Sequence, residues 1–142
     1  MDKNLAYAAE LLKSQNYTCV LYNGIHTFTS KERGVKPLLQ WLNEDFCGKG
    51  FSAADRVVGK AAAFLYVLLG IKEMHAVVIS EAAVATLLKY KITVSYDTLA
   101  KTIINRSGTG LCPMEQITLP IEDPREALVA IKAKIKELQE RS

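Results

Sequence analysis

Residues 54–69, with the sequence ADRVVGKAAAFLYVLL, form the longest largely apolar stretch of the chain, and Lys60 is the one lysine within it. Ser52 and Asp55 have the S-x-x-D spacing of a capping box, which predicts a helix that begins at Ser52 and ends at Gly70. A helix that is apolar on almost every side is normally central and buried. Because a buried lysine is costly unless its charge is paired, this helix predicts a polar site around Lys60.

Three environments suit a lysine on such a helix. The side chain extends to the surface, pairs with a carboxylate, or faces an anionic ligand. Gly59 precedes Lys60, and glycine inside a helix costs about 1 kcal/mol relative to alanine. We therefore expect a neighbouring element or a ligand to approach the backbone closely at Gly59. Asp55 is four residues from Gly59 and shares its helix face. Its capping role is one explanation, and a place at the border of a pocket is the other.

The bulk properties indicate a single globular domain over residues 1–142, with 49% hydrophobic and 23% charged residues. A net charge of +3, without basic clusters interleaved with aromatics, does not indicate a nucleic-acid partner. The apolar run 61–71 is too short to span a membrane, which takes about 20 residues. With three cysteines and no pattern typical of a signal peptide, we expect a cytoplasmic protein.

Hydrophobic periodicity and turn residues divide the chain into alternating helices and strands. Asn23-Gly24 between two β-rich runs predicts a hairpin. The predicted helices cover residues 2–15, 36–43, 81–90 and 124–140, with a helical turn over 97–104, and the predicted later strands cover 75–79 and 92–94. A hairpin followed by alternating strands and helices predicts an α/β fold, a three-layer α/β/α sandwich with a mixed sheet and right-handed crossovers.

The segment Cys112-Pro113-Met114-Glu115 has the composition of a second helix start. Cys112 is expected at the N-cap, Pro113 at the first helical position and Glu115 at the third, where its side chain stabilises the helix start. A cysteine at a helix N-terminus tends toward thiolate character, which suits a nucleophile, a metal ligand or a redox-sensitive thiol. A small, half-buried cysteine without chemistry explains Cys112 equally well.

The loop before this helix, residues 105–110 with the sequence NRSGTG, is polar and rich in glycine. Such a backbone ahead of a helix can hold an anion, and Arg106 adds positive charge, but an ordinary loop has the same composition. His26 and His75 are expected to be surface or packing residues. No C-x-x-C, H-x-x-x-H or H-x-E is present, so we predict no zinc site.

Three motifs together resemble one protein family. They are D-R-V-V-G-K-A-A-A at 55–63, N-R at 105–106 and C-P-M-E at 112–115. With the order of the predicted elements, they resemble the DUF1893 family of uncharacterised prokaryotic proteins, whose fold is similar to that of cytidine deaminases. The resemblance covers nearly the whole chain, and it implies a cytidine deaminase-like domain.

Zinc deaminases carry H-x-E at one helix start and P-C-x-x-C at another. The resemblance places Val58-Gly59-Lys60 at the first motif and Cys112–Glu115 at the second, so only one of three metal ligands is kept. Hydrolytic deamination needs the metal-bound water and the glutamate, so it is not expected here. The resemblance instead implies a cavity bordered by Asp55, Lys60, Cys112 and Glu115, with Asn105 and Arg106 at its rim and an ion pair between Lys60 and Glu115.

Three functions remain open from the sequence. The leading hypothesis is a pocket without metal or cofactor that binds a small anionic or nucleotide-like ligand, through Asp55, Gly59, Lys60, Asn105, Arg106 and Glu115. The second is an enzyme with Cys112 as nucleophile, assisted by Lys60 or Asp55. The third is a structural or interaction protein in which Lys60 and Glu115 form only a buried pair. A homo-oligomer is expected from the resemblance alone.

Overall fold

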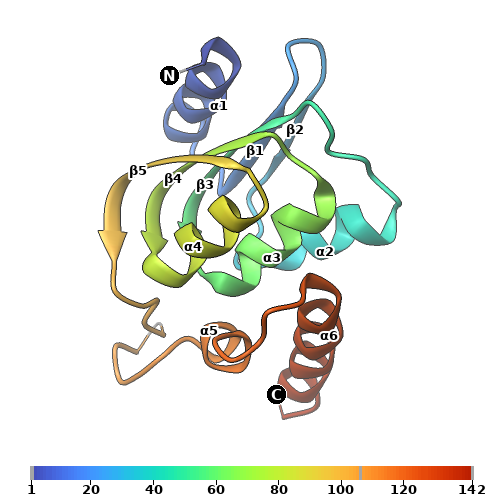
Figure 1. Cartoon of the computed structure of the whole chain (residues 1–142), viewed down its shortest axis with the longest axis vertical. Helices are drawn as coiled ribbons and strands as arrows, with labels where there is room; N and C mark the ends of the chain where they lie inside the picture. The colour runs from blue at the N-terminus through green and yellow to red at the C-terminus, as the bar shows by residue number, and fades with distance from the viewer. Residues whose placement is uncertain (1, 106, 142) are drawn as a thin grey trace.

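The computed structural model describes residues 2–105 and 107–141, and it contains a five-stranded sheet with helices on both faces (Figure 1). In chain order the elements are α1 (Lys3–Ser14), β1 (Cys19–Tyr22), β2 (Thr27–Ser30), α2 (Lys36–Asn43), β3 (Ser52–Val58), α3 (Lys60–Leu69), β4 (Glu73–Ser80), α4 (Glu81–Lys89), β5 (Thr93–Ala100), α5 (Pro113–Thr118) and α6 (Pro124–Arg141).

The sheet is mixed, as the sequence predicts, with the strand order β2-β1-β3-β4-β5. The hairpin strands β1 and β2 are antiparallel, and β1 is also antiparallel to β3. The strands β3, β4 and β5 are parallel to one another. Parallel neighbours need a crossover connection, and α3 and α4 supply it. Both helices therefore begin at the carboxyl edge of the parallel strands, where ligands bind in open α/β sheets.

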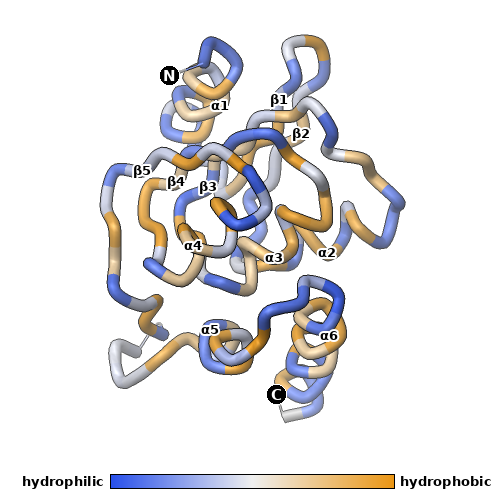
Figure 2. The backbone as a smooth tube through the Cα atoms, viewed as in Figure 1, coloured by the Kyte–Doolittle hydropathy of each residue, from blue (hydrophilic) through white to orange (hydrophobic). Residues whose placement is uncertain are grey.

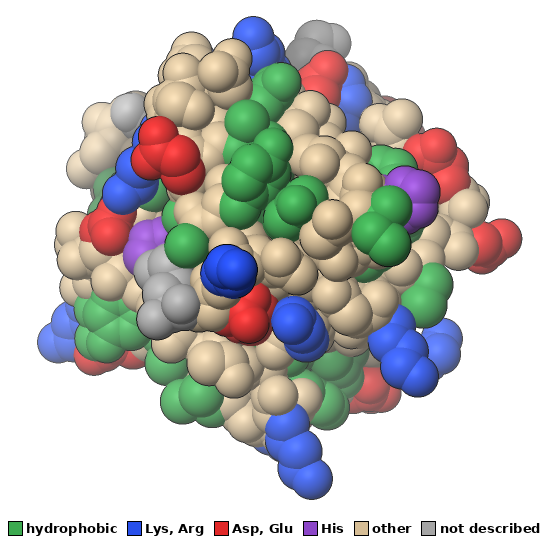
Figure 3. All heavy atoms as spheres, turned by 90° about the horizontal axis from the view of Figure 1, so that it is seen from above, with side chains coloured by type: hydrophobic (Ala, Val, Ile, Leu, Met, Phe, Trp, Pro, Cys, Tyr) green, Lys and Arg blue, Asp and Glu red, His purple; other side chains and the backbone are tan. Residues whose placement is uncertain are grey.

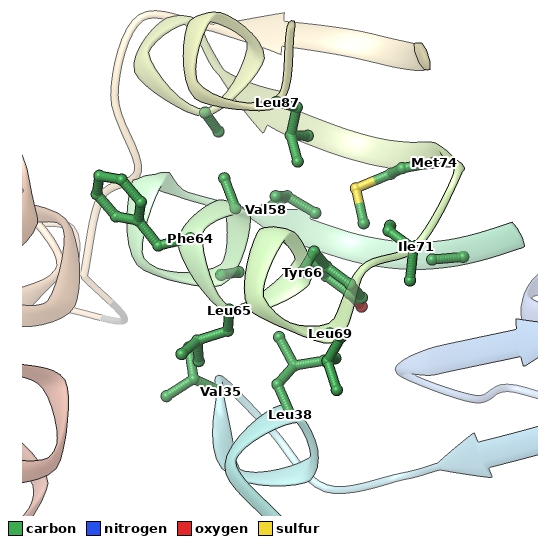
Figure 4. Close-up of a cluster of buried hydrophobic side chains, with 14 of the residues drawn as sticks. Val35, Leu38, Val58, Phe64, Leu65, Tyr66, Leu69, Ile71, Met74 and Leu87 are labelled. Carbon is green, nitrogen blue, oxygen red and sulfur yellow. The ribbon is translucent and has the colours of Figure 1, made fainter. Parts of the chain in front are cut away.

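The helices divide between the two faces of the sheet. On one face α1 packs on β1 and β3, where Ala8 and Leu12 meet Val20 and Ala54 in a small core. The main core lies on the other face, between the sheet and the helices α2, α3 and α4 (Figure 4). α6 packs on the outside of α3 and buries Ala127 and Ile131. In Figure 2 the hydrophobic colour marks much of β4 and α3, and it alternates with hydrophilic colour along the outer helix α6.

The single helix predicted over residues 52–69 is wrong. Residues Ser52–Val58 form β3, and α3 begins only at Lys60. The segment is mostly buried although it contains Asp55 and Arg56, and periodicity cannot separate a short buried strand from a buried helix. The S-x-x-D spacing at Ser52 is therefore not a capping box, and Asp55 lies in the middle of a strand. The predicted end at Gly70 is confirmed, with φ at 83°.

Most other predicted elements are confirmed. The helix α2 has the predicted bounds, and Ser80 caps α4 by accepting a hydrogen bond from the Ala83 N–H. Cys112 is the N-cap of α5, as expected. The helical turn predicted at Asp97 is wrong, because residues Thr93–Ala100 form the edge strand β5. It pairs with β4 on one side only, and most of its residues are exposed.

The surface carries charges of both signs. On the face shown in Figure 3, Lys and Arg side chains are interspersed with Asp and Glu side chains around a hydrophobic strip. This mixture agrees with the net charge of +3. Among the described helices, none has the length and apolar character needed to cross a membrane.

Candidate functional site

A cavity of about 460 Å³ lies at the carboxyl end of β3, between the starts of α3 and α5. Four of the predicted site residues line it: Asp55, Gly59, Cys112 and Glu115. Its remaining wall is largely apolar and comes from the segment before α2, the first turn of α3 and residues 103–104. Segments far apart in the sequence thus meet at one site, as the resemblance implies for the VGK and CPME motifs.

The start of α3 is completed by a residue from α5. Gly59 is the N-cap and supplies no side-chain hydrogen bond. Instead, Glu115 Oε1 accepts from the Lys60 backbone N–H at 2.8 Å, and its Oε2 accepts from the Ile103 N–H at 2.9 Å. Glu115 is 2% exposed. Its carboxylate therefore joins the loop before α5 to the positive end of the α3 dipole.

Gly59 allows this close approach, which confirms the expectation for that position. A Cβ atom at Gly59 would lie 3.3 Å from Glu115 Oε1 and 3.2 Å from Ile103 Cγ1. The neighbour that approaches the backbone is thus the carboxylate of Glu115. The φ of Gly59 is −95°, so the requirement is space and not an unusual backbone conformation.

The Lys60 side chain does not enter this cavity. Its Nζ donates to the Leu119 carbonyl at 2.7 Å and lies 3.7 Å from a carboxylate oxygen of Glu122. The ion pair predicted with Glu115 is therefore wrong. Lys60 is the first residue of α3, so its N–H is free for Glu115 while its side chain extends toward the connection between α5 and α6.

A buried hydrogen-bonded chain borders the cavity on its sheet side. The Tyr66 hydroxyl of α3 donates to Asp55 Oδ2 at 2.6 Å, and the Cys19 Sγ lies 2.9 Å from the same hydroxyl oxygen. Cys19 and Asp55 are direct partners on the antiparallel strands β1 and β3, so both side chains face α3. The hydroxyl of Tyr66 is visible at the edge of the core in Figure 4.

Burial changes the acidity of all three groups. Burial raises the pKa of Asp55 from 3.8 to about 7, although the hydrogen bond from Tyr66 opposes this shift. Burial, together with the nearby Asp55 charge, raises the pKa of Tyr66 and of Cys19 well above their ordinary values. Near neutral pH, Asp55 therefore exists in both its protonated and its ionised form.

The remaining predicted residues take different places. Cys112 is half-buried at the N-cap of α5, and its N–H donates to the Ile103 carbonyl at 2.9 Å. The Asn105 side chain accepts from the Thr109 N–H at 3.0 Å, so it organises its own loop and does not line the cavity. Arg106 lies outside the described residues. Within residues 2–105 and 107–141, no three His, Cys, Asp or Glu side chains are placed to hold a metal ion.

The comparisons with known proteins identify the family. The family model described as "Domain of unknown function (DUF1893)" matches residues 7–135. The chain belongs to the DUF1893 family. This DUF1893 domain is also similar to a solved structure of a DUF1893 family protein from Thermotoga maritima, with 29% sequence identity and a TM-score of 0.86. The match covers 94% of this chain and 92% of that one.

A search of curated proteins found no match to this DUF1893 domain. Neither the family model nor the solved structure is described as a deaminase, so the cytidine deaminase likeness stays a prediction.

Sequence reasoning missed Cys19, Tyr66 and Arg33 in this DUF1893 domain. Cys19 and Arg33 line the cavity, and Tyr66 holds Asp55. One signal was available, because a tyrosine in an apolar buried segment needs a partner for its hydroxyl. No local pattern points to Cys19, whose contact with Tyr66 spans 47 residues of sequence.

Proposed function

We propose that the 460 Å³ cavity binds a small anionic or nucleotide-like ligand. The observation that carries this proposal is the meeting of a buried acid, a helix start and a largely apolar wall in one cavity. Ligand pockets of this kind are mostly apolar with a few placed polar groups, and their volumes are typically about 300–1,000 Å³.

The start of α3 favours a ligand that carries an anionic group. Ala61 and Ala62 line the cavity as the second and third residues of α3. Backbone N–H groups at these positions have no partner within a helix, and they lie at the positive end of its dipole. Arg33 lines the same cavity with an exposed side chain, which adds a positive charge.

Arg56 is less suited to contact the ligand, although it also lines the cavity. Its guanidinium donates to the backbone carbonyls of Leu12 and Tyr17, at 2.8 and 2.6 Å. These bonds hold the end of α1 against β3.

The position of Asp55 favours a ligand that has a hydrogen-bonding group along one edge. With a pKa of about 7, its carboxyl group can accept or donate a hydrogen bond near neutral pH. The side chains of Val35, Ile103, Ile104 and Met114 give the cavity apolar surface for a flat ring. A nucleotide-like molecule combines these three features: a planar ring, a polar edge and an anionic group.

A thermal-shift screen of nucleosides and nucleotides tests the proposal. A ligand at 100 times its Kd stabilises the folded state by about 2.7 kcal/mol. Ile104→Trp fills the cavity and is expected to abolish the shift. Leu88→Trp, at an exposed position of α4 that does not line the cavity, is the matched control. No shift with any compound, or an equal shift in Ile104→Trp, contradicts the proposal.

A cysteine-dependent reaction is the second candidate, because Cys112 shares the cavity with Asp55. Asp55 in its ionised form is a base within the same cavity, whereas the Lys60 side chain lies outside it. Alkylation of each cysteine, followed by peptide mass spectrometry, tests this role. Cys112 is expected to react faster than the exposed Cys47, and Asp55→Asn is expected to slow Cys112 alone. Equal rates for the two thiols contradict it.

A cytoplasmic location and a homo-oligomer accompany this proposal as predictions from the sequence. Fractionation of the cells that make the protein and sedimentation of the purified chain test them directly.

A further inference from the structure

A second cavity, of about 260 Å³, lies between α3, α4 and the connection from α5 to α6. Lys60 and Lys89 both line it, together with Tyr90 and Glu122. Ala82 and Ala85 present only methyl groups from α4, which leaves the space open. The volume is well above the roughly 30 Å³ that one water molecule occupies in the liquid.

The Lys60 ammonium is buried with incomplete pairing. Its side chain is 8% exposed, and it borders the Phe64 ring at 5.5 Å from the centroid. An ammonium has three N–H donors. The Leu119 carbonyl accepts one of them at 2.7 Å. Among the residues that the structure describes, the nearest carboxylate oxygen belongs to Glu122 and is 3.7 Å away, which is beyond hydrogen-bond distance.

Glu122 lies between the two lysines. Its carboxylate oxygens are 3.7 Å from Lys60 Nζ and 3.6 Å from Lys89 Nζ. The Glu122 side chain is 76% exposed, so solvent weakens both ion pairs and the side chain can turn away at little cost. The carboxylate thus occupies the position that an oxyanion would take between two ammonium groups.

We propose that this second cavity is a phosphate site. Lys60 and Lys89 would hold the phosphate dianion, and Glu122 would turn out to solvent as the ion enters. The ammonium groups of lysines bind phosphate as point charges. The same chemistry accommodates inorganic phosphate and the phosphate group of a small monoester. This site is separate from the 460 Å³ cavity and does not depend on the function proposed there.

Isothermal titration with potassium phosphate and with glycerol phosphate, each at the same ionic strength in potassium chloride, tests the proposal. Saturable binding at one site per chain is expected for at least one of them. The tighter of the two identifies the source of the phosphate group.

Four variants sharpen the test. Glu122→Gln removes the competing carboxylate and is expected to tighten binding. Lys89→Met is expected to weaken binding about tenfold or more, since it removes one of the two ammonium groups that hold the phosphate. Ala85→Leu fills the cavity without changing any charge, and it is expected to abolish binding. Lys136→Met, at an exposed position of α6, is the matched control for the loss of one positive charge.

The expected pattern is unchanged binding in Lys136→Met, weaker binding in Lys89→Met and no binding in Ala85→Leu. Lys89 and Ala85 are both exposed, so these variants test the site without disturbing the core. No saturable binding overturns the proposal. Equal weakening by Lys89→Met and Lys136→Met also overturns it, because that result indicates a diffuse charge effect. Loss of binding in Arg33→Met but not in Lys89→Met assigns the ion to the other cavity and overturns it as well.

Discussion

The starts of α3 and α4 face the same edge of the sheet but are capped in different ways. At α4 the cap is local, since the Ser80 hydroxyl accepts from the Ala83 N–H at 3.2 Å. At α3 the N-cap is Gly59, and the acceptor is Glu115, which lies 55 residues beyond Lys60. A local cap completes a helix by itself. A distant cap joins two parts of the chain and leaves a cavity where they meet.

The strands before these helices carry different residues at the paired position beside the cavity. Asp55 of β3 and Ala76 of β4 are register partners, and both are buried. Alanine there only fills space, whereas Asp55 needs the Tyr66 hydroxyl as a partner. The β3–α3 unit therefore carries a buried acid beside the cavity and a distant cap, whereas the buried acid of β4, Glu73, lies at the opposite end of its strand from the locally capped α4. Stability measurements on the two units separate these features.

Removing the distant cap has the largest expected effect. Glu115→Ala leaves the Lys60 and Ile103 N–H groups without their acceptor, and each charged hydrogen bond contributes about 1.5–3 kcal/mol. We expect the free energy of unfolding in urea to fall by about 3–6 kcal/mol. A loss below that of Ser80→Ala would show that the distant cap is not the stronger one.

The next largest effect is a dependence of the unfolding free energy on pH, which the buried carboxyl group of Asp55 causes. The pKa of Asp55 is about 7 in the folded protein and 3.8 in its ordinary state, so the unfolded chain loses this proton first as pH rises. The contribution of Asp55 to stability therefore falls between about pH 4 and pH 7, by an amount on the order of 4 kcal/mol.

Asp55→Asn is the control variant for this dependence of stability on pH. The variant has no carboxyl group at this position, so it should not lose this contribution to stability. We therefore expect the unfolding free energy of the variant to rise relative to that of the parent protein as pH rises from 4 to 7. Urea denaturation at each pH measures it. A difference that does not change with pH would contradict the raised pKa of Asp55.

Filling the space at Gly59 has a smaller effect. In Gly59→Ala the new methyl group meets Glu115 and Ile103 at 3.3 and 3.2 Å, and crowding of this kind costs about 1–3 kcal/mol. Combining Gly59→Ala with Glu115→Ala tests whether crowding against Glu115 causes this cost. The cost of Gly59→Ala is expected to shrink in that background, because one of the two crowding groups is gone.

The local cap has the smallest expected effect. Ser80→Ala removes one acceptor at the start of α4 and is expected to cost about 1 kcal/mol. Ser80→Thr keeps the hydroxyl acceptor without adding a buried charge and is expected to restore part of that loss. Thermal or urea unfolding of both variants provides the measurement. No loss in Ser80→Ala would mean that packing alone completes α4.

The same contrast explains what the sequence predicts well. Ser80 and Cys112 are found as caps because their signals lie within a few residues of the helix that they start. The hairpin at Asn23 is found for the same reason, since the Asn23 side chain accepts from the N–H groups of Ile25 and His26. Short-range chemistry of this kind can be read from one segment alone.

Long-range pairing explains what the sequence does not predict. Residues 52–58 are mostly buried, and their pairing with β1 and β4, which lie far away in the sequence or across a helix, makes them a strand. The partner of Lys60 was wrongly assigned to Glu115, because the resemblance gives the location of a pocket but not the direction of a side chain. Four of the predicted site residues nevertheless line one cavity, because the segments around Gly59 and Cys112 meet at the carboxyl end of β3.

The contact between Glu115 and the start of α3 also determines which helix start can be completed first while the chain is being synthesised. A chain that emerges from the ribosome can complete the start of α4 as soon as residue 83 is exposed, because Ser80 and Ala83 are then both present. The start of α3 emerges earlier but must wait for residue 115. The cavity wall contributed by residues 103–104 and by Cys112, Met114 and Glu115 is therefore among the last parts to assemble, after most of the sheet has been made.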